Sequence, residues 1–234
     1  MGMIIVNKIS AEELKKLELF KNIKKETLIK LSTIGIKIAI KKGQHIFRDK
    51  DIVKTIYIIL EGKVSLYKLS ESSNKKVMYI LGRDNIINEV ILDNLPESIN
   101  CEVFEKGEIL TFNQTEFLEL MKEDFELTKV VIDSLSIKIR RLYRQLRNTT
   151  PLKIEKRVAA KLWKLGKDYG VDVKEGTLIN LDITITYLAD MLGSQRETIS
   201  RALKQLEILG LIKFQGKKIV IINKNNLSNY FKGL

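Results

Sequence analysis

Residues 183–212 read "ITITYLADMLGSQRETISRALKQLEILGLI", and this stretch decides the fold of the C-terminal part of the chain. Thr184 can cap a helix that runs to about Leu192, and Gly193 ends that helix with a tight turn. Ser194 then opens a second helix, with Glu197 three residues later, which is the spacing of a capping box. The order of helix, short glycine turn and helix predicts a helix-turn-helix.

The second of these helices has two chemically different sides. Its apolar residues mark the side that we expect to be buried: Ile199, Ala202, Leu203, Leu206 and Leu209. Its N-terminal part is polar, and in helix-turn-helix proteins this end enters the major groove of DNA. Arginine can donate two hydrogen bonds to guanine, and glutamate can accept one from cytosine. We therefore predict base reading by Arg196, Glu197, Ser200 and Arg201; the alternatives are a solvated helix face and, for Glu197, a capping role.

Other polar residues around this motif suit contacts with DNA phosphates, which position a protein without specifying sequence. We expect such contacts from Thr184, Thr186, Ser194, Gln195 and Lys204. Downstream, "LIKFQGKKIVII" places two β-like runs on either side of a short turn, which predicts a hairpin, or wing. Lys217 and Lys218 near its tip are further phosphate candidates, unless the hairpin is simply solvated.

The charge of the chain favours a polyanionic partner. The net charge is +12, and residues 151–234 hold 15 Lys and Arg against 8 Asp and Glu, whereas residues 1–150 hold 26 against 21. The excess per residue is therefore greater in the part that carries the helix-turn-helix. Double-stranded DNA is the partner that this distribution predicts, although a general bias toward lysine would produce the same sign.

The N-terminal half has a different pattern. Residues 12–34 read as one or two short amphipathic helices, and residues 36–112 as short β-branched runs broken by turn signals at "EG" and "ESSN". Strands at this spacing without intervening helices predict an antiparallel barrel or jelly roll. A short helix follows in "TEFLELMKED". The fold class is therefore α+β.

A long helix is predicted from Phe125 to about Arg147. Residues spaced alternately by three and four form a heptad seam along it: Phe125, Thr128, Ile132, Leu135, Ile139, Leu142 and Leu146. A second apolar line (Leu127, Val130, Val131, Ile137) could cover the strand domain while the seam meets a partner helix. We expect a parallel homodimer through the seam; the alternative is a helix buried against its own domain.

The chain is predicted to divide into four parts. These are an effector-like domain with N-terminal helices over residues 1–123, a dimerisation helix over 124–147, a hinge at 148–151 and a winged helix-turn-helix domain over 152–234. "NTTP" breaks the long helix, because Pro151 suits a first helical turn. A further helix follows over about 152–168, and residues 171–177 read as a turn region.

Several functions are excluded or disfavoured by the scarcity of reactive residues. Cys101 is the only cysteine and His45 the only histidine. One cysteine cannot form an intrachain disulfide, a cysteine metal cage or an iron–sulfur site. A single histidine argues against haem ligation, Ser-His-Asp catalysis and a cupin-like metal enzyme. We therefore expect neither an enzyme nor a metal cofactor. No apolar run spans a membrane and no secretory signal is recognisable, so the expected location is the cytoplasm.

The quoted motifs together resemble the Crp/Fnr family of transcription regulators. "LADMLGSQRETISRALKQLEILGLI" with "GKKIVI" resembles the C-terminal signature of that family, and "TIYIILEGKVSLY" resembles its N-terminal strand pair. The resemblance implies a β-roll like a cyclic nucleotide-binding domain, a dimer helix and a winged helix-turn-helix. Arg196, Glu197 and Arg201 match the base-reading triplet, and Ser200 resembles the serine of the oxygen-sensor branch. It also implies RNA polymerase as a partner and a palindromic site with half-sites similar to TGTGA or TTGAT, of which Arg196 favours the former.

The effector pocket implied by the resemblance departs from the cyclic-AMP type. Asn88 and Glu89 stand for a Gly-Glu pair, and Glu97 and Ser98 for an Arg-Ser pair whose arginine binds phosphate. Leu142 and Tyr143 stand for the Thr-Ser pair that meets the nucleobase. A carboxylate would repel a cyclic phosphate, so we expect that cyclic AMP is not the effector. The open alternatives are an unknown small molecule, a regulator without an effector, and a small-molecule-binding module without DNA function.

Overall fold

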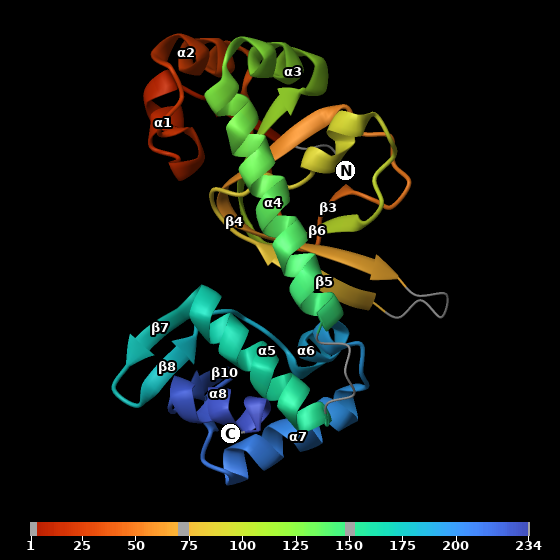
Figure 1. The fold of residues 1–234 in the computed structure, drawn as a ribbon, viewed down its shortest axis with the longest axis vertical. Helices are drawn as coiled ribbons and strands as arrows, with labels where there is room; N and C mark the ends of the chain where they lie inside the picture. The colour runs from red at the N-terminus through yellow and green to blue at the C-terminus, as the bar shows by residue number, and fades with distance from the viewer. Residues whose placement is uncertain (1–3, 70–74, 148–152, 234) are drawn as a thin grey trace. The chain divides into compact units, whose positions relative to one another are not determined.

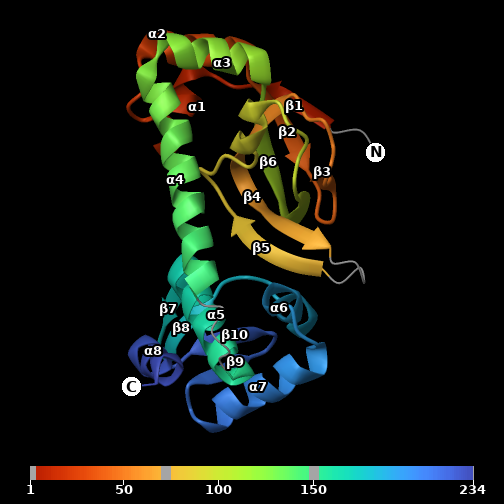
Figure 2. The same ribbon diagram turned by 45° about the vertical axis from the view of Figure 1, so that its right-hand side comes forward.

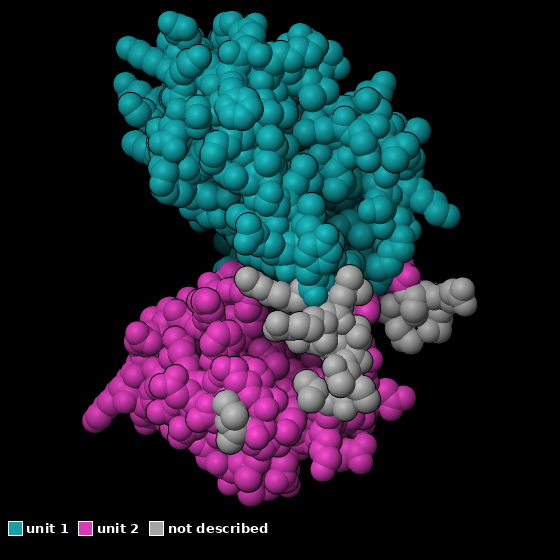
Figure 3. Space-filling view, in the orientation of Figure 1, with its two compact units in different colours: residues 1–68, 77–147 teal, residues 69–76, 148–234 magenta. Residues whose placement is uncertain are grey.

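The computed structural model describes residues 4–69, 75–147 and 153–233, and it divides the chain into two compact units (Figure 3). The first unit consists of residues 1–68 and 77–147, and the second of residues 69–76 and 148–234. We describe each unit by itself. The predicted hinge at 148–151 lies outside the described residues.

Short helices precede the main sheet in the first unit, as the sequence predicts. They are α1 (Ala11–Lys15), the 3-10 turn η1 (Glu18–Phe20) and α2 (Lys25–Ile34). Ser10 caps α1 reciprocally with Glu13, with the Glu13 N–H donating to Ser10 Oγ over 3.1 Å. This satisfies donors that would otherwise lack partners at the helix start. Figure 1 shows these helices beside α3 (Gln114–Glu123), near the N-terminal end of α4 (Phe125–Arg147).

A six-stranded sheet forms the body of the unit, and its pairs are antiparallel as predicted. The strands are β1 (Ile4–Lys8), β2 (Ile36–Ile40), β3 (His45–Phe47), β4 (Thr55–Leu69), β5 (Lys75–Leu81) and β6 (Asn100–Asn113). Their order is β1-β2-β6-β4-β5, with β3 also paired to β6. Neither β1 nor the 3-10 segment η2 (Glu89–Asp93) was predicted from the sequence. We call this sheet together with η2 the roll.

The predicted turn at "EG" is wrong, because β4 continues through Glu61 and Gly62 without interruption. The pairing of β4 with β6 shifts register here, and Gly62 has a φ of 81°. A Cβ on the facing Gly107 would lie 2.1 Å from the Glu61 carbonyl oxygen. Two glycines thus let the backbones approach closely and the long strands bend without a break, which is a bulge rather than a turn.

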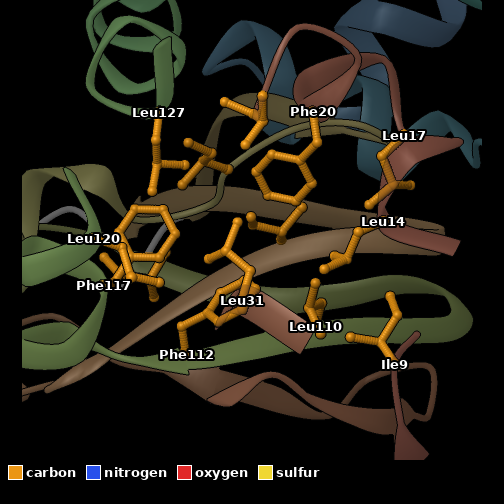
Figure 4. Packing of buried hydrophobic residues seen from close by; sticks show 14 of the residues in the cluster. Ile9, Leu14, Leu17, Phe20, Leu31, Leu110, Phe112, Phe117, Leu120 and Leu127 are labelled. Atoms are coloured by element: carbon orange, nitrogen blue, oxygen red, sulfur yellow. The ribbon is translucent and has the colours of Figure 1, made fainter. Parts of the chain in front are cut away.

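Two apolar clusters hold the unit together. One fills the roll around Ile59, Val64 and Val103. The other joins the N-terminal helices, the sheet and α4, with Phe20, Phe112, Phe117 and Leu127 among its members (Figure 4). At about 25 cal/mol per Å² of buried apolar area, large side chains such as these dominate the attachment of the helices.

The long helix α4 (Phe125–Arg147) has the predicted bounds. Leu127 and Val131 are buried in the second cluster and Val130 packs against it, so one side of α4 covers the domain as expected. Ile137, assigned to the same line, is 51% exposed, and that assignment is wrong. The 3.6-residue repeat carries position 137 away from the buried side of the helix.

The second unit is a small helical domain with its own sheet. Its elements are α5 (Ile154–Tyr169), β7 (Gly170–Val173), β8 (Gly176–Ile179), α6 (Ile185–Leu192), α7 (Arg196–Ile208), β9 (Ile212–Gln215), β10 (Lys218–Ile221) and α8 (Lys224–Lys232). The sheet order is β7-β8-β10-β9. Residues 171–177, predicted as a turn region, instead form most of the β7–β8 hairpin, and α8 was not predicted. The α+β class and the order of elements are confirmed.

Replacing Gly107 by Ala should destabilise the first unit by about 2 kcal/mol or more, because the new methyl group would overlap the Glu61 carbonyl. Urea unfolding of the full chain measures the change. Gly82→Ala is the matched control, since its nearest foreign atom is Lys63 Cγ at 3.9 Å. Equal stability of the two variants would contradict the bulge assignment.

Candidate DNA-reading surface and effector site

The helix-turn-helix is built from α6 and α7, which follow one another in Figure 2. Thr184 caps α6 as predicted, with its Oγ1 accepting from the Tyr187 N–H over 3.0 Å. Gly193 ends α6 with a φ of 58°, a left-handed conformation that glycine adopts without strain. Arg157 of α5 donates a hydrogen bond to the Leu192 carbonyl oxygen and so holds the turn from outside. No pattern in the sequence predicts this role of Arg157.

The predicted capping box at the start of α7 is wrong. The helix begins at Arg196, and its N-cap is Gln195, whose side chain makes no capping hydrogen bond. The Ser194 N–H bonds to the Ala189 carbonyl oxygen over 3.1 Å, so Ser194 belongs to the turn. Glu197 is therefore the second helical residue rather than the third. Its carboxylate has no capping duty and stays available to solvent or to a ligand.

The polar side chains of α7 face solvent together. Arg196, Glu197, Ser200, Arg201 and Lys204 are exposed, and their side chains make no hydrogen bond or ion pair with any residue that the structure describes. Ile199, Ala202, Leu203 and Leu206 are buried on the other side as expected. Leu209 is 48% exposed, so its assignment to the buried side is wrong; it is the C-cap, beyond the packed turns.

The other predicted phosphate contacts have different surroundings. Gln195 and Thr186 are exposed. In the wing, β9 pairs with β10 around Gly216, and Lys217 is exposed at the tip. Lys218 donates to Asn180 Oδ1 over 2.7 Å and is half-buried. Lys217 is therefore the better placed of the two lysines for a phosphate.

Three of the predicted effector residues meet between the roll and α4. Asn88 is buried, accepts from the Tyr57 N–H over 3.0 Å and donates to the Thr55 carbonyl oxygen over 2.9 Å, so it fastens η2 to β4. Glu89 is buried and accepts from Ser134 Oγ over 2.7 Å. Its other oxygen binds the ammonium of Lys138.

Ser134 and Lys138, which reach this site from α4, were not predicted as site residues. They are one helical turn apart, so both lie on the same side of the helix. Lys138 also donates to the carbonyl oxygens of Ile86 and Ile87, over 3.1 and 3.0 Å. Burial lowers the pKa of Lys138, while Glu89 opposes that shift. The signal in the sequence that could have identified Lys138 is its position on the apolar side of an amphipathic helix.

Glu97 is the unusual member of the site. Its side chain is 2% exposed, and neither carboxylate oxygen has a hydrogen-bond partner among the described residues. Burial raises the pKa of Glu97 from 4.5 to about 7, against the opposing influence of Asn88 and Lys138. The same environment raises the pKa of the buried Cys101 thiol, which makes it a poor nucleophile.

The remaining predicted effector residues do not join this cluster. Ser98 is exposed, and only its carbonyl oxygen is engaged, by Lys68 Nζ at 2.9 Å. Leu142 and Tyr143 are exposed on α4, one turn or more beyond Lys138. Among the described side chains, no group of three or more His, Cys, Asp or Glu could hold a metal ion.

The predicted seam is largely exposed in the single chain. We call the residues Phe125, Ile132, Ile139, Leu142 and Tyr143 the apolar face of α4; their side chains are between 38% and 69% exposed. Leu135 is half-buried against the core, and Thr128 donates to the Met121 carbonyl oxygen over 2.6 Å. The side chain of Leu146 lies outside the described part. An exposed apolar stripe of this length on a helix is typical of a surface that pairs with another helix.

Comparison with known proteins agrees with both units. A model of the cyclic nucleotide-binding domain matches residues 37–124, and a model of the Crp-like helix-turn-helix domain matches residues 156–230. The chain is 24% identical over 198 residues to the anaerobic regulatory protein of Bacillus subtilis (strain 168), covering 84% of this chain and 83% of that protein. It is 21% identical to the CRP-like cAMP-activated global transcriptional regulator of Mycobacterium tuberculosis, covering 80% and 84%.

Solved structures share the whole architecture. A mutant of CooA from Carboxydothermus hydrogenoformans superposes with a TM-score of 0.76 at 15% identity, covering 97% of this chain and 98% of that one. The c-di-GMP-responsive regulator CLP of Xanthomonas campestris gives 0.75 at 19% identity, covering 86% and 100%.

A sensory domain of the cyclic nucleotide-binding type joined to a winged helix-turn-helix defines a DNA-binding transcription regulator rather than an enzyme. This chain belongs to the Crp/Fnr family of such regulators.

Replacing Glu97 by Gln should change how stability depends on pH. Because the pKa of Glu97 is raised to about 7, the folded chain holds this proton more tightly than the unfolded chain. The resulting stability is complete below a pH of about 4.5 and is lost as the pH rises through about 7. We expect the variant, relative to the natural chain, to gain about 1–2 kcal/mol more at pH 8 than at pH 5. Urea unfolding at both pH values measures this.

The exposed Glu116→Gln, on α3, is the matched control and should show no such difference. An equal effect of Glu97→Gln at both pH values would contradict the assignment of a buried proton at Glu97.

Proposed function

We propose that this regulator binds a palindromic DNA site as a homodimer, with one α7 in the major groove of each half-site. The observation that carries the proposal is the group of exposed, unpaired side chains at the start of α7: Arg196, Glu197, Ser200 and Arg201. Two-fold symmetry of the protein requires half-sites separated by about one helical turn, roughly 34–36 Å.

The apolar face of α4 supports the homodimer. It lies on the side of α4 opposite Leu127 and the neighbouring core residues, so a second copy can cover it without disturbing the fold of either chain. A parallel pairing of two α4 helices would bring identical residues together across a two-fold axis. We take RNA polymerase as a further partner and the cytoplasm as the location, as for a regulator of this family. No helix in the described residues has the length and apolar character needed to cross a membrane.

Control by the roll is the second element of the proposal. Glu97 stands where a phosphate-binding arginine would be needed, and a buried carboxylate disfavours an anionic effector such as cyclic AMP. A groove of about 250 Å³ beside α4, lined in part by Ser134, Ile137 and Lys138, gives room for another small molecule.

A regulator that needs no organic effector is the competing candidate. The observation that favours it is the bridge of Lys138 and Ser134 to Glu89, which ties α4 to the roll with the chain's own side chains. The two candidates differ in whether metabolites alter DNA affinity, which fluorescence anisotropy with labelled duplex measures directly.

Replacing Arg196 by Ala should weaken binding to a palindromic duplex by roughly 5- to 150-fold and relax discrimination at one base pair, because a bidentate guanine contact is worth about 1–3 kcal/mol. Lys217→Ala should instead weaken binding to all sequences and reduce the salt dependence. Arg48→Ala, at an exposed position on the roll, is the matched control. Unchanged sequence preference in the Arg196 variant would overturn the base-reading assignment.

Replacing Ile139 by Glu should convert the dimer into monomers, because two carboxylates would face each other across the symmetric contact. Sedimentation velocity at micromolar concentration measures this, and DNA affinity should fall with it. Ile52→Glu, at a 79% exposed position of the roll, introduces the same charge away from α4. A natural chain that sediments as a monomer, or an Ile139 variant that stays dimeric, would contradict pairing through α4.

A further inference from the structure

The buried ionisable groups between the roll and α4 do not balance one another. Glu89 is paired with Lys138, and Glu97 is a second carboxyl in the same interior without a hydrogen-bond donor in the described part of the chain. Among the charged groups that influence the pKa of Glu97, Lys138 is the one cation and Glu89 and Asp51 are anions; the neutral amide of Asn88 also favours the charged form of Glu97. A buried carboxylate without a paired cation is unfavourable, and the smallest cation that can neutralise it is a proton.

The backbone fixes Glu97 in this interior. Its N–H donates to the Asp51 carbonyl oxygen over 2.9 Å, and its own carbonyl oxygen accepts from the Lys50 N–H over 2.7 Å. The segment is therefore paired on both sides with the loop between β3 and β4. The main chain at Glu97 is therefore held on both sides, and the side chain that it carries is buried, with 2% of the residue exposed.

Groups from several elements interact electrostatically with this carboxyl. Asn88 precedes η2, Tyr57 lies on β4, and Cys101 lies on β6; Tyr57 and Cys101 both have pKa values raised chiefly by burial and further by Glu97. Lys138 approaches from α4, Glu89 from η2 and Asp51 from the loop after β3. The surroundings are thus two competing carboxylates, neutral polar groups and one ammonium.

Lys138 connects this cluster to the surface of α4. Successive helical residues are about 100° apart, so Lys138 pointing into the roll sets the rotation that turns its neighbour Ile139 outward. Ile139 is 45% exposed and belongs to the apolar face of α4. A change in the partner of Lys138 therefore acts on the helix that carries the proposed dimer contact.

We propose that Glu97 and Lys138 form a proton-operated connection between the roll and α4, with the proton as an effector of this regulator. When Glu97 is protonated, Glu89 is the one carboxylate that attracts Lys138, and the bridge from Lys138 to Glu89 and to the Ile86 and Ile87 carbonyl oxygens holds α4. When Glu97 releases its proton to solvent, Lys138 is attracted by two carboxylates, while Glu97 repels Glu89 and Asp51. The bridge between Lys138 and Glu89 is then weaker, so the orientation of α4 about its own axis is held less firmly. The inference rests on the proposed control of DNA binding through the roll.

The expected consequence is tighter DNA binding on the acid side of neutrality. Binding should weaken by at least about threefold between pH 6 and pH 8 relative to the Glu97→Gln variant, which imitates the protonated form at every pH. Comparison with that variant removes the pH effects that arise elsewhere in the protein or the DNA.

The test combines two readouts on the full chain. Carbon-13 NMR of glutamate-labelled protein follows each side-chain carboxyl through pH 5–9 and should show one that titrates near pH 7 and is missing in Glu97→Gln. Amide resonances of residues 134–141 should move with the same midpoint. Fluorescence anisotropy with a labelled palindromic duplex follows affinity over the same range, and Glu116→Gln should behave like the natural chain in both readouts.

The outcomes separate the switch from the DNA-binding proposal. A carboxyl that titrates near pH 7 with α4 and with DNA affinity, all lost in Glu97→Gln, supports the switch. Absence of that titration, or amides of α4 that ignore it, overturns the switch whatever the DNA result. Affinity with the same pH dependence in both proteins overturns the coupling to DNA. No binding to any duplex overturns the proposed function, while the NMR readout still decides whether Glu97 and α4 are coupled.

Discussion

The two-sided character of α4 is the constraint on which the rest of this structure depends. One side packs into the core through Leu127 and Val131 and binds Glu89 through Ser134 and Lys138. The other side exposes a row of apolar residues that one chain cannot bury. Because both sides belong to one rigid helix, the contacts in the roll and the geometry offered to a partner cannot be chosen independently.

The interior between the roll and α4 contains more buried carboxyl groups than cations to pair with them. In this chain the polar groups of the interior are the carboxyl groups of Glu89 and Glu97, the amide of Asn88 and the ammonium of Lys138, which comes from α4. The lysine supplies internally the positive charge that these carboxylates require, and the surplus carboxyl of Glu97 remains. One relative is named as cAMP-activated and one structural neighbour as c-di-GMP-responsive, and both are similar to this chain.

The sequence was sufficient for the periodic features and insufficient for the aperiodic ones. The span of α4, the glycine turn and the buried side of α7 up to Leu206 follow from spacing, and the structure contains them. The dimer seam stays a prediction. The strand through Gly62 depends on its pairing with β6, a strand far along the chain, which no local pattern encodes. The hairpin over 170–179 and α8 are local elements that were not predicted. The start of α7 was misjudged because Ser194 fits a cap equally well and only the bond to Ala189 decides between them. Lys138 was missed because its partner lies 49 residues away in sequence.

The displacement of the start of α7 by one residue has a consequence for selectivity. Glu197 sits in the first turn, where the partial positive charge of the helix end stabilises its carboxylate in the free protein. On DNA the same charge faces a dense array of phosphates. The carboxylate gains a favourable contact only where a base offers a hydrogen-bond donor, and at other sequences its repulsion from the phosphates weakens binding. In the proposed complex with DNA, the carboxylate of Glu197 would therefore shorten the residence of this basic protein on sequences that lack such a donor.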